Sequence, residues 1–307
     1  MAKYILKRIL MLIPVVIGIT LFIFVIMSLA PGDPATLILG ADATYEEILA
    51  KRMELGLNDP VLIRYLKYMV GVIQGDFGIS WYNGYNVMSE FLSRIPNTLI
   101  LGLLSNAIVI MVGIPLGVIA AVKQNGVIDY CTLILAMLFS SMPAFWFGLM
   151  AQIYFCLNLG WFPATGADSL KNFVLPAVTL ASASLAGQVR LTRTSMLEVN
   201  KLDYVRTARS KGCSESRIIL KHVLRNGLLP VVTGIGGHIA TIVGGAIVTE
   251  SVFAIPGVAS LMINAVKIRD VPVVMGIIVV ISVFVGVVNL LVDLTYAVID
   301  PRVKLNG

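Results

Sequence analysis

The chain has 307 residues, of which 58% are hydrophobic and 13% are charged, and its mean hydropathy is +0.91. Because soluble domains carry about 25% charged residues, this composition excludes a soluble domain and indicates a polytopic membrane protein. The net charge of +6 comes from basic residues that flank apolar segments, which is typical of a topology signal and argues against a nucleic-acid partner.

The first apolar segment covers residues 9–30 and follows Lys3, Lys7 and Arg8. It carries no charge, and at about 1.5 Å per residue it is long enough to cross a hydrocarbon layer about 30 Å thick. A cleaved signal peptide is the alternative. It is disfavoured because the apolar run is too long and residues 31–34 do not resemble a small-residue cleavage site. We therefore predict a retained membrane span.

A polar insertion follows over residues 31–97, with eight acidic and five basic side chains. Helices are predicted over residues 44–57 and 61–72, with Asn58, Asp59 and Pro60 between them. The acidic excess predicts that this insertion forms a small folded cap on the outer side of the membrane.

Five further spans are predicted over residues 98–122, 130–157, 173–191, 228–248 and 271–298. Gly113 and Gly117 favour close helix contact in the second span. Pro143 is expected to break the third span. Small polar residues and Gln188 interrupt the fourth span, which we interpret as a sign of helix packing. The fold class is therefore an all-α polytopic membrane protein with six transmembrane helices.

The last two spans and their connection carry three further expectations. In the fifth span a close-packed glycine-rich face is expected, made by Gly237, Thr241, Gly244 and Gly245. Residues 250–270 are predicted to form an outer loop that turns at residues 255–257. After the sixth span, residues 301–307 form a short basic tail.

Several chemically capable residues are interpreted as structural. Cys131, Cys156 and Cys213 show neither metal-ligand spacing nor an even disulfide framework, so no metal site is predicted. His238 is interpreted as a packing residue and Asp293 as half of a structural pair. Asp293 is nearly alone at membrane depth, which disfavours an ion-coupled secondary transporter. No His-Glu-x-x-His or Gly-x-Ser-x-Gly pattern occurs, which disfavours an intramembrane enzyme.

The longest charged stretch between two apolar segments in the C-terminal half covers residues 200–225, which we call the charged hairpin. Residues 190–225 hold nine of the 23 basic residues. Two short helices hinged at Gly212 are predicted, the second with Ser214 as N-cap and Glu215 in its first turn. Its basic face is expected to carry Arg217, Lys221 and Arg225, and its apolar face Ile219, Leu220, Val223 and Leu224. Docking onto a partner, fixing of topology and binding to anionic lipid all remain open on this pattern.

Residues 203–212, DYVRTARSKG, resemble the coupling ("EAA") loop of ABC-importer permeases. Arg206, Thr207 and Ala208 stand at the first three positions of that motif and Gly212 at its last. The initial Glu and the first Ala of the motif are absent. These departures resemble the dipeptide, oligopeptide and nickel branch of the family. Further similar segments at residues 29–34, 55–60, 75–80, 94–98, 255–257 and 289–302 extend the resemblance over nearly the whole chain.

The resemblance implies a type I ABC-importer fold and a non-enzymatic pore subunit. Its implied partners are a second, homologous permease subunit, two cytoplasmic ATPases that bind ATP and Mg, and an extracytoplasmic substrate-binding protein. No cofactor is expected on this chain itself. The coupling loop would span residues 193–228, within a core of residues 98–300 that follows residues 1–30 and the insertion. The residues implied to meet an ATPase are Asp203, Tyr204, Arg206, Thr207, Ala208, Arg209, Lys211 and Gly212.

Basic residues support one orientation of the six spans. Segments assigned to the inner side hold fifteen basic residues and those assigned to the outer side hold eight, mixed with eleven acids. The positive-inside rule thus predicts that both termini and the charged hairpin lie in the cytoplasm. The resemblance implies that the chain lies in the plasma membrane of a bacterium. The sequence contains no G-x-x-x-x-G-K-[ST] motif, so ATP would act through another polypeptide. Di- or oligopeptides are the expected substrate, with nickel chelates and glutathione as alternatives.

Overall fold

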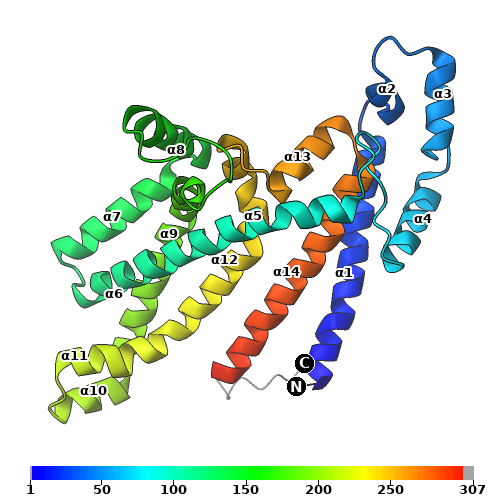
Figure 1. Cartoon of the computed structure of the whole chain (residues 1–307). Coiled ribbons are helices and arrows are strands. Elements are labelled where there is room, and N and C mark those ends of the chain that lie inside the picture. Colours follow the sequence, from blue (N-terminus) through cyan, green and yellow to red (C-terminus); the bar gives the residue numbers. More distant parts are fainter. Residues whose placement is uncertain (1, 300–307) are drawn as a thin grey trace. The chain divides into compact units, whose positions relative to one another are not determined.

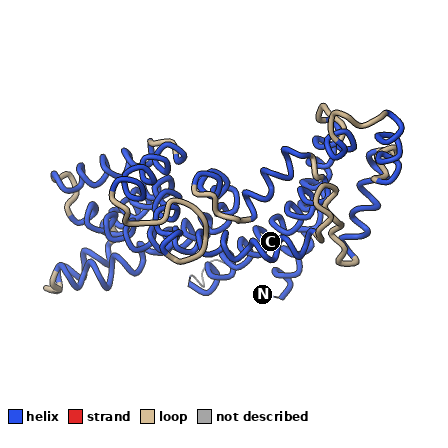
Figure 2. The backbone as a smooth tube through the Cα atoms, turned by 45° about the horizontal axis from the view of Figure 1, so that its top comes forward, coloured by secondary structure: helices blue, strands red, loops and turns tan. Residues whose placement is uncertain are grey.

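The computed structural model describes the backbone of residues 2–299, and side chains for these residues except 2–4, 239–245, 293 and 295–299. The expectations for Thr241, Gly244, Gly245, Asp293 and the tail at 301–307 therefore lie outside the described side chains. Residues 2–299 consist of helices and loops, with no β-strand among them (Figure 2). The all-α prediction is confirmed.

The chain divides into two compact units. The first comprises Met1–Thr98 and Pro256–Val287, and the second comprises Leu99–Ile255 and Val288–Gly307. The division falls inside two continuous helices, α5 (Val87–Ile108) and α14 (Val271–Ile299).

The first unit contains all of the residues that were predicted as insertion, 31–97. Its helices, besides parts of α5 and α14, are α1 (Ala2–Leu29), α2 (Pro34–Leu39), α3 (Tyr45–Glu54), α4 (Val61–Ile73) and α13 (Val258–Ile268) (Figure 1). Val87 and Phe91 of α5 pack with Val258 and Leu261 of α13 and with Ile277 of α14. The insertion therefore shares its core with the last helix of the chain.

Helix α3 confirms the first predicted helix of the insertion. Thr44 and Glu47 form a capping box: the Thr44 backbone N–H donates to the Glu47 carboxylate at 2.8 Å, and the Glu47 N–H donates to Thr44 Oγ1 at 3.4 Å. These bonds satisfy helix-terminal donors, and they hold the pKa of Glu47 below its ordinary value. Helix α4 likewise matches the second predicted helix.

Two adjacent residues before α14 connect three distant segments of the first unit. Arg269 adopts a left-handed conformation with φ of 57°, and its guanidinium donates to the carbonyl oxygens of Ala30, Pro31 and Gly32. The buried Asp270 carboxylate accepts hydrogen bonds from the Ser80 hydroxyl and from the Trp81 N–H. The end of α1, the insertion and the start of α14 are held together by these charge-assisted bonds.

The second unit is built around α9 (Lys171–Asn200). Its other elements are the ends of α5 and α14, η1 (Val109–Gly113), α6 (Ile114–Val122), α7 (Val127–Ser141), α8 (Ala144–Ala151), η2 (Gln152–Asn158), α10 (Asp203–Ser210), α11 (Glu215–Arg217), η3 (Ile218–Val223) and α12 (Leu224–Val252). The three η elements are π-helical turns. Figure 1 shows α10 and α11 at the opposite end of this unit from α8.

Small residues explain why helices pack so closely on α9. A Cβ atom placed on Gly117 would lie 2.5 Å from Thr192 Cβ, and one on Gly113 would lie 3.1 Å from Gln188 Cγ. The buried hydroxyl of Thr192 donates to the Gln188 carbonyl of its own helix at 2.8 Å. These contacts confirm that Gly113 and Gly117 mediate helix approach and that the polar residues of the fourth span serve packing.

Among the described residues, five helices are long and apolar enough to cross a membrane, and a sixth span is obtained when α7 and the α8–η2 segment count as one. That pair bends by 94°, with the break at Met142 and Pro143, as predicted from Pro143. The number of spans matches the prediction on this count.

Three helix boundaries were predicted wrongly. Helix α5 begins at Val87, not at residue 98, and Pro96 lies inside it. Helix α12 continues η3 and α11 without a break from Glu215, whereas its span was expected to begin at residue 228. Residues 250–270 are not a simple loop, because α12 reaches Val252 and α13 occupies Val258–Ile268. The assignment of residues 31–97 to the outer side stays a prediction.

Candidate functional site

The charged hairpin lies where α9 ends and α12 begins. Helix α10 confirms the first of the two predicted short helices. The second helix begins at Glu215, as predicted, but it is not a separate short helix, because it continues through a π-helical turn into α12. Ser214 occupies the N-cap position, but its side chain makes no capping hydrogen bond. The charged hairpin is thus a direct extension of two long helices.

Gly212 ends α10 in a left-handed turn with φ of +77°. The Gly212 N–H donates to the Arg209 carbonyl at 3.0 Å, and the Cys213 N–H donates to the Ala208 carbonyl at 3.3 Å. This pair of bonds is the Schellman arrangement, which satisfies the last carbonyls of a helix and requires a positive φ. The predicted hinge at Gly212 is therefore a defined turn that only glycine adopts without strain.

The inner face of the charged hairpin is apolar. Val205 and Ala208 of α10 pack on Ile218 and Val223, together with Met196 of α9. Leu220, which was expected on this apolar face, is 64% exposed, and Ile218 is fully buried instead. The reason is the π-helical turn over Ile218–Val223, which changes the phase of the helix relative to a regular 3.6-residue repeat.

The solvent-exposed face of α10, which we call its outer face because it points away from the rest of the chain, carries most of the residues that the resemblance assigned to an ATPase contact. The side chains of Asp203 and Arg206 are 99% and 73% exposed. Tyr204, Thr207, Lys211 and Gly212 are also exposed, whereas Ala208 is buried against the apolar cluster. Asp203 lies in the first turn of α10, where a carboxylate is favoured by the helix dipole.

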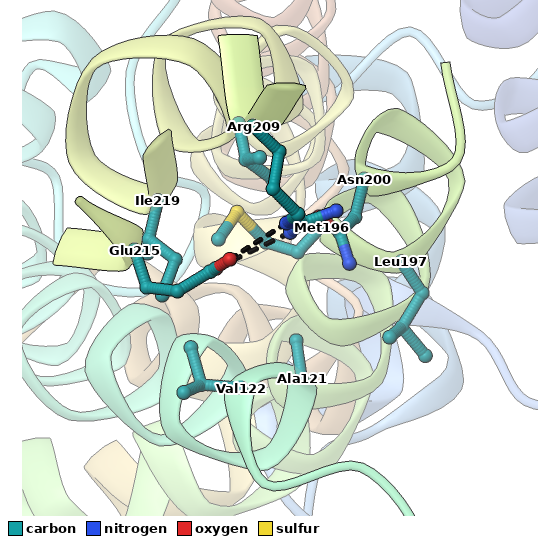
Figure 3. Close-up of a pocket in the computed structure, with 9 residues that line it drawn as sticks. Ala121, Val122, Met196, Leu197, Asn200, Arg209, Glu215 and Ile219 are labelled. Atoms are coloured by element: carbon teal, nitrogen blue, oxygen red, sulfur yellow. Dashed lines mark hydrogen bonds and ion pairs between the residues drawn. The ribbon is translucent and has the colours of Figure 1, made fainter. Parts of the chain in front are cut away.

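Arg209 faces inward, across a cavity of about 250 Å³ beneath the charged hairpin (Figure 3). Its Nε donates to Glu215 Oε1 at 2.6 Å, and its Nη2 donates to Glu215 Oε2 at 3.2 Å and to Asn200 Oδ1 at 3.3 Å. The hydrogen bonds to Glu215 raise the pKa of Arg209 above its ordinary value. The cavity is lined by Ala121, Val122, Met196, Leu197, Asn200, Arg209, Glu215, Ile219 and Val223.

Tyr204 connects α10 to the start of α12. Its hydroxyl donates to the His222 carbonyl at 3.3 Å and accepts a hydrogen bond from Asn226 Nδ2 at 2.8 Å. Arg209 and Tyr204 therefore tie α10 to both neighbouring helices. Of the residues predicted as docking contacts, these two have a second role inside the chain.

An ion pair near the charged hairpin was missed by the sequence reasoning. Arg193 of α9 donates through Nε and Nη2 to the two oxygens of Asp129, at 2.7 and 2.6 Å. The Asp129 side chain is 1% exposed, and the Asn125 N–H also donates to it, at 2.9 Å. The bidentate pair fixes the start of α7 against α9. The available signal was an acid in the short loop before an apolar segment, opposite a basic cluster.

Comparison with known proteins identifies the family. The family described as binding-protein-dependent transport system inner membrane component matches residues 113–305, and its N-terminal companion family matches residues 1–102. The chain belongs to this family, whose members are membrane subunits of ABC importers.

Curated relatives align over nearly the full length of the chain. The oligopeptide transport system permease protein AppB of Bacillus subtilis is 42% identical, covering 99% of this chain and 100% of the relative. The glutathione transport system permease protein GsiC of Salmonella paratyphi A is 40% identical, with 99% of each chain covered. The dipeptide transport system permease protein DppB of Escherichia coli K12 is 38% identical, again with 99% of each covered.

Two solved structures support the fold. An inward-facing structure of the MetNI methionine ABC transporter matches with a TM-score of 0.56 and 16% identity, covering 69% of this chain and 97% of that one. An amino acid ABC transporter solved with histidines matches with a TM-score of 0.52 and 18% identity, covering 68% and 94%. The predicted type I ABC-importer fold is confirmed by these similarities.

Proposed function

We propose that this permease subunit imports small peptides into the cytoplasm, driven by ATP hydrolysis on separate subunits that bind the charged hairpin. The observation that carries the proposal is the exposed outer face of α10. The opposite face of this helix packs on the apolar cluster, and α10 is hydrogen-bonded to the segments that follow it, so its exposed face is held in place. The concentration of basic residues around the charged hairpin supports a location of this face on the cytoplasmic side, where ATP is found.

The coupling mechanism follows from the connections of α10. Because the charged hairpin joins α9 directly to α12, a force on α10 is applied to the ends of two long helices. The Arg209–Glu215 pair and the Tyr204 contacts keep α10 from moving alone. Closure of two ATPases on ATP would thus shift α9 and α12 as one rigid element between two arrangements.

The proposed partners are two ATPases, a second homologous permease subunit and an extracytoplasmic binding protein. Helix α3 supports a role in meeting the binding protein, since none of its residues is buried and Tyr45 and Met53 are 77% and 63% exposed. The proposed topology has both termini in the cytoplasm of a bacterium, with ATP and Mg bound by the ATPases and no cofactor bound by this chain.

The proposed substrate class rests on the relatives. The relatives, which are 38–42% identical to this chain, are named as permeases for oligopeptides, dipeptides and glutathione. Glutathione is itself a tripeptide, so these substrates share amide groups and charged termini. Short peptides are therefore proposed as the cargo. Uptake assays with labelled di-, tri- and pentapeptides and glutathione, using the reconstituted complex, will rank these substrates.

A charge reversal on the outer face of α10 tests the coupling role. Arg206→Glu should abolish ATP-driven peptide uptake by the reconstituted complex and weaken co-purification of the ATPases, because its side chain points away from the chain. Lys171→Glu is the matched control: it makes the same charge change at an exposed position at the start of α9, at the other end of that helix from the charged hairpin. Equal uptake by the Arg206→Glu variant and the wild type would contradict docking through α10.

A further inference from the structure

Helix α4 exposes an apolar stripe that the proposed function does not use. Leu62, Leu66, Val70 and Ile73 follow one another at intervals of four, four and three residues, so they share one face of the helix. Their exposures are 59%, 54%, 54% and 82%. Such a contiguous exposed stripe indicates a surface that something apolar covers.

An adjoining face of α4, about a quarter turn from the stripe, fixes the height of the helix along α1. The buried Tyr65 hydroxyl donates to the Ile17 carbonyl at 3.1 Å and hydrogen-bonds Thr20 Oγ1 at 2.9 Å. Thr20 lies nine residues before Leu29, the last residue of the first candidate span. At about 1.5 Å per residue, this contact is about 14 Å below the end of that span.

Contacts with α14 agree with this height. Tyr65 shares a hydrophobic cluster with Val271 and Met275, which lie in the first two turns of the last span. A hydrocarbon layer is about 30 Å thick, so α4 lies beside the half of both spans that contains the end of α1 and the start of α14. A soluble partner on the membrane surface does not reach this level.

The third face of α4 is cationic. The Lys67 ammonium pairs with Asp59 at 2.6 Å and is 69% exposed, and the Arg64 guanidinium lies 5.6 Å from the centre of the Phe24 ring. Helix α4 has 13 residues, about 20 Å, which is too short to cross the bilayer. An apolar stripe beside basic side chains on a short helix is the pattern of a helix that lies in the membrane interface.

We propose that α4 is a membrane-interface helix whose Leu62, Leu66, Val70 and Ile73 stripe contacts the acyl chains of the outer leaflet, with Lys67 at the level of the headgroups. The insertion is then attached to the bilayer and not simply suspended above it. This inference holds whichever solute the chain transports.

Spin labels on α4 test the proposal in the full transporter complex, reconstituted in nanodiscs of phosphatidylcholine and phosphatidylglycerol. The background replaces Cys131, Cys156 and Cys213 by alanine and must retain uptake. Single cysteines are then introduced as Leu66→Cys and Val70→Cys on the stripe. Lys67→Cys is the control on the same helix, and Tyr45→Cys is the water-exposed control on α3, measured in the complex without the binding protein.

The labels at positions 66 and 70 should have high collision rates with oxygen and very low collision rates with a water-soluble nickel chelate. The label at position 45 should show the reverse. The label at position 67 should show intermediate collision rates with both reagents. Nickel access at 66 and 70 equal to that at 45 would overturn the proposal, since the stripe would then face water. Labels shielded from both reagents would also overturn it, because a protein partner would then cover the stripe.

Discussion

Replacement of Gly117 by alanine measures how tightly α6 and α9 pack. The added Cβ would lie 2.5 Å from Thr192 Cβ and 2.8 Å from the Val189 carbonyl oxygen. Ordinary contact begins at 3.4 Å, so the helices must separate by ~0.9 Å at this point. Rotation of Thr192 alone cannot relieve the clash, because the carbonyl belongs to the backbone. Overpacking of this kind costs about 1–3 kcal/mol of unfolding free energy.

The matched control is Gly187→Ala on α9, where an added Cβ meets no atom within 4 Å. Both changes replace a helical glycine by alanine, which favours the helix by about 1 kcal/mol. Their difference in unfolding free energy therefore isolates the packing cost, with Gly117→Ala the less stable by about 1–3 kcal/mol.

Unfolding of the purified chain in mixed micelles, followed by tryptophan fluorescence during titration with a denaturing detergent, gives both free energies. If Gly117→Ala is as stable as Gly187→Ala, the close approach of α6 to α9 does not exist in the folded protein, and the reasoning fails. The same comparison at Gly113, where the nearest atom would be 3.1 Å away, should give an intermediate cost.

Two further changes probe the surroundings of the charged hairpin. Asp129→Asn should lower the unfolding free energy by about 2 kcal/mol, as expected for a lost hydrogen bond to a charged group. Arg193→Lys should also be less stable than the wild type, because a lysine cannot bind both carboxylate oxygens at once. Thermal unfolding of the wild type and the two variants checks these differences. Gly212→Val should reduce ATP-driven uptake because a branched side chain strains the turn at φ +77°, whereas Gly212→Asn should retain most uptake since asparagine tolerates this conformation. Equal uptake by the two Gly212 variants would show that the turn geometry is unimportant.

Much of the fold could be predicted because membrane spans are long, uncharged and apolar. Of the predicted first span, residues 9–29 form part of α1, and Pro143 breaks the third span where its missing N–H predicts a break. The start of α5 could not be predicted in this way. Pro96 normally marks a helix boundary, yet in α5 it lies in the interior, where the Glu90–Arg94 pair one turn earlier supports the helix.

In the candidate site, too, some features could be predicted from local sequence and others could not. The location of α10 and the glycine turn follow from local sequence, because helix caps and positive φ angles depend on neighbouring residues. The burial of Ile218 depends on a π-helical turn, and the Asp129–Arg193 pair joins residues 64 positions apart. A single sequence indicates that Asp129 could have a basic partner, but it does not identify which residue that partner is, so both features had to come from the structure.

The inward orientation of Arg209 changes the electrical character of the docking face. With Arg209 neutralised by Glu215, the exposed charges of the outer face come from Arg206, Lys211 and the opposing Asp203. Only one net positive charge is left on this face of α10. Added salt should therefore weaken the contact made by α10 only slightly, since close fit and hydrogen bonds would supply most of its affinity.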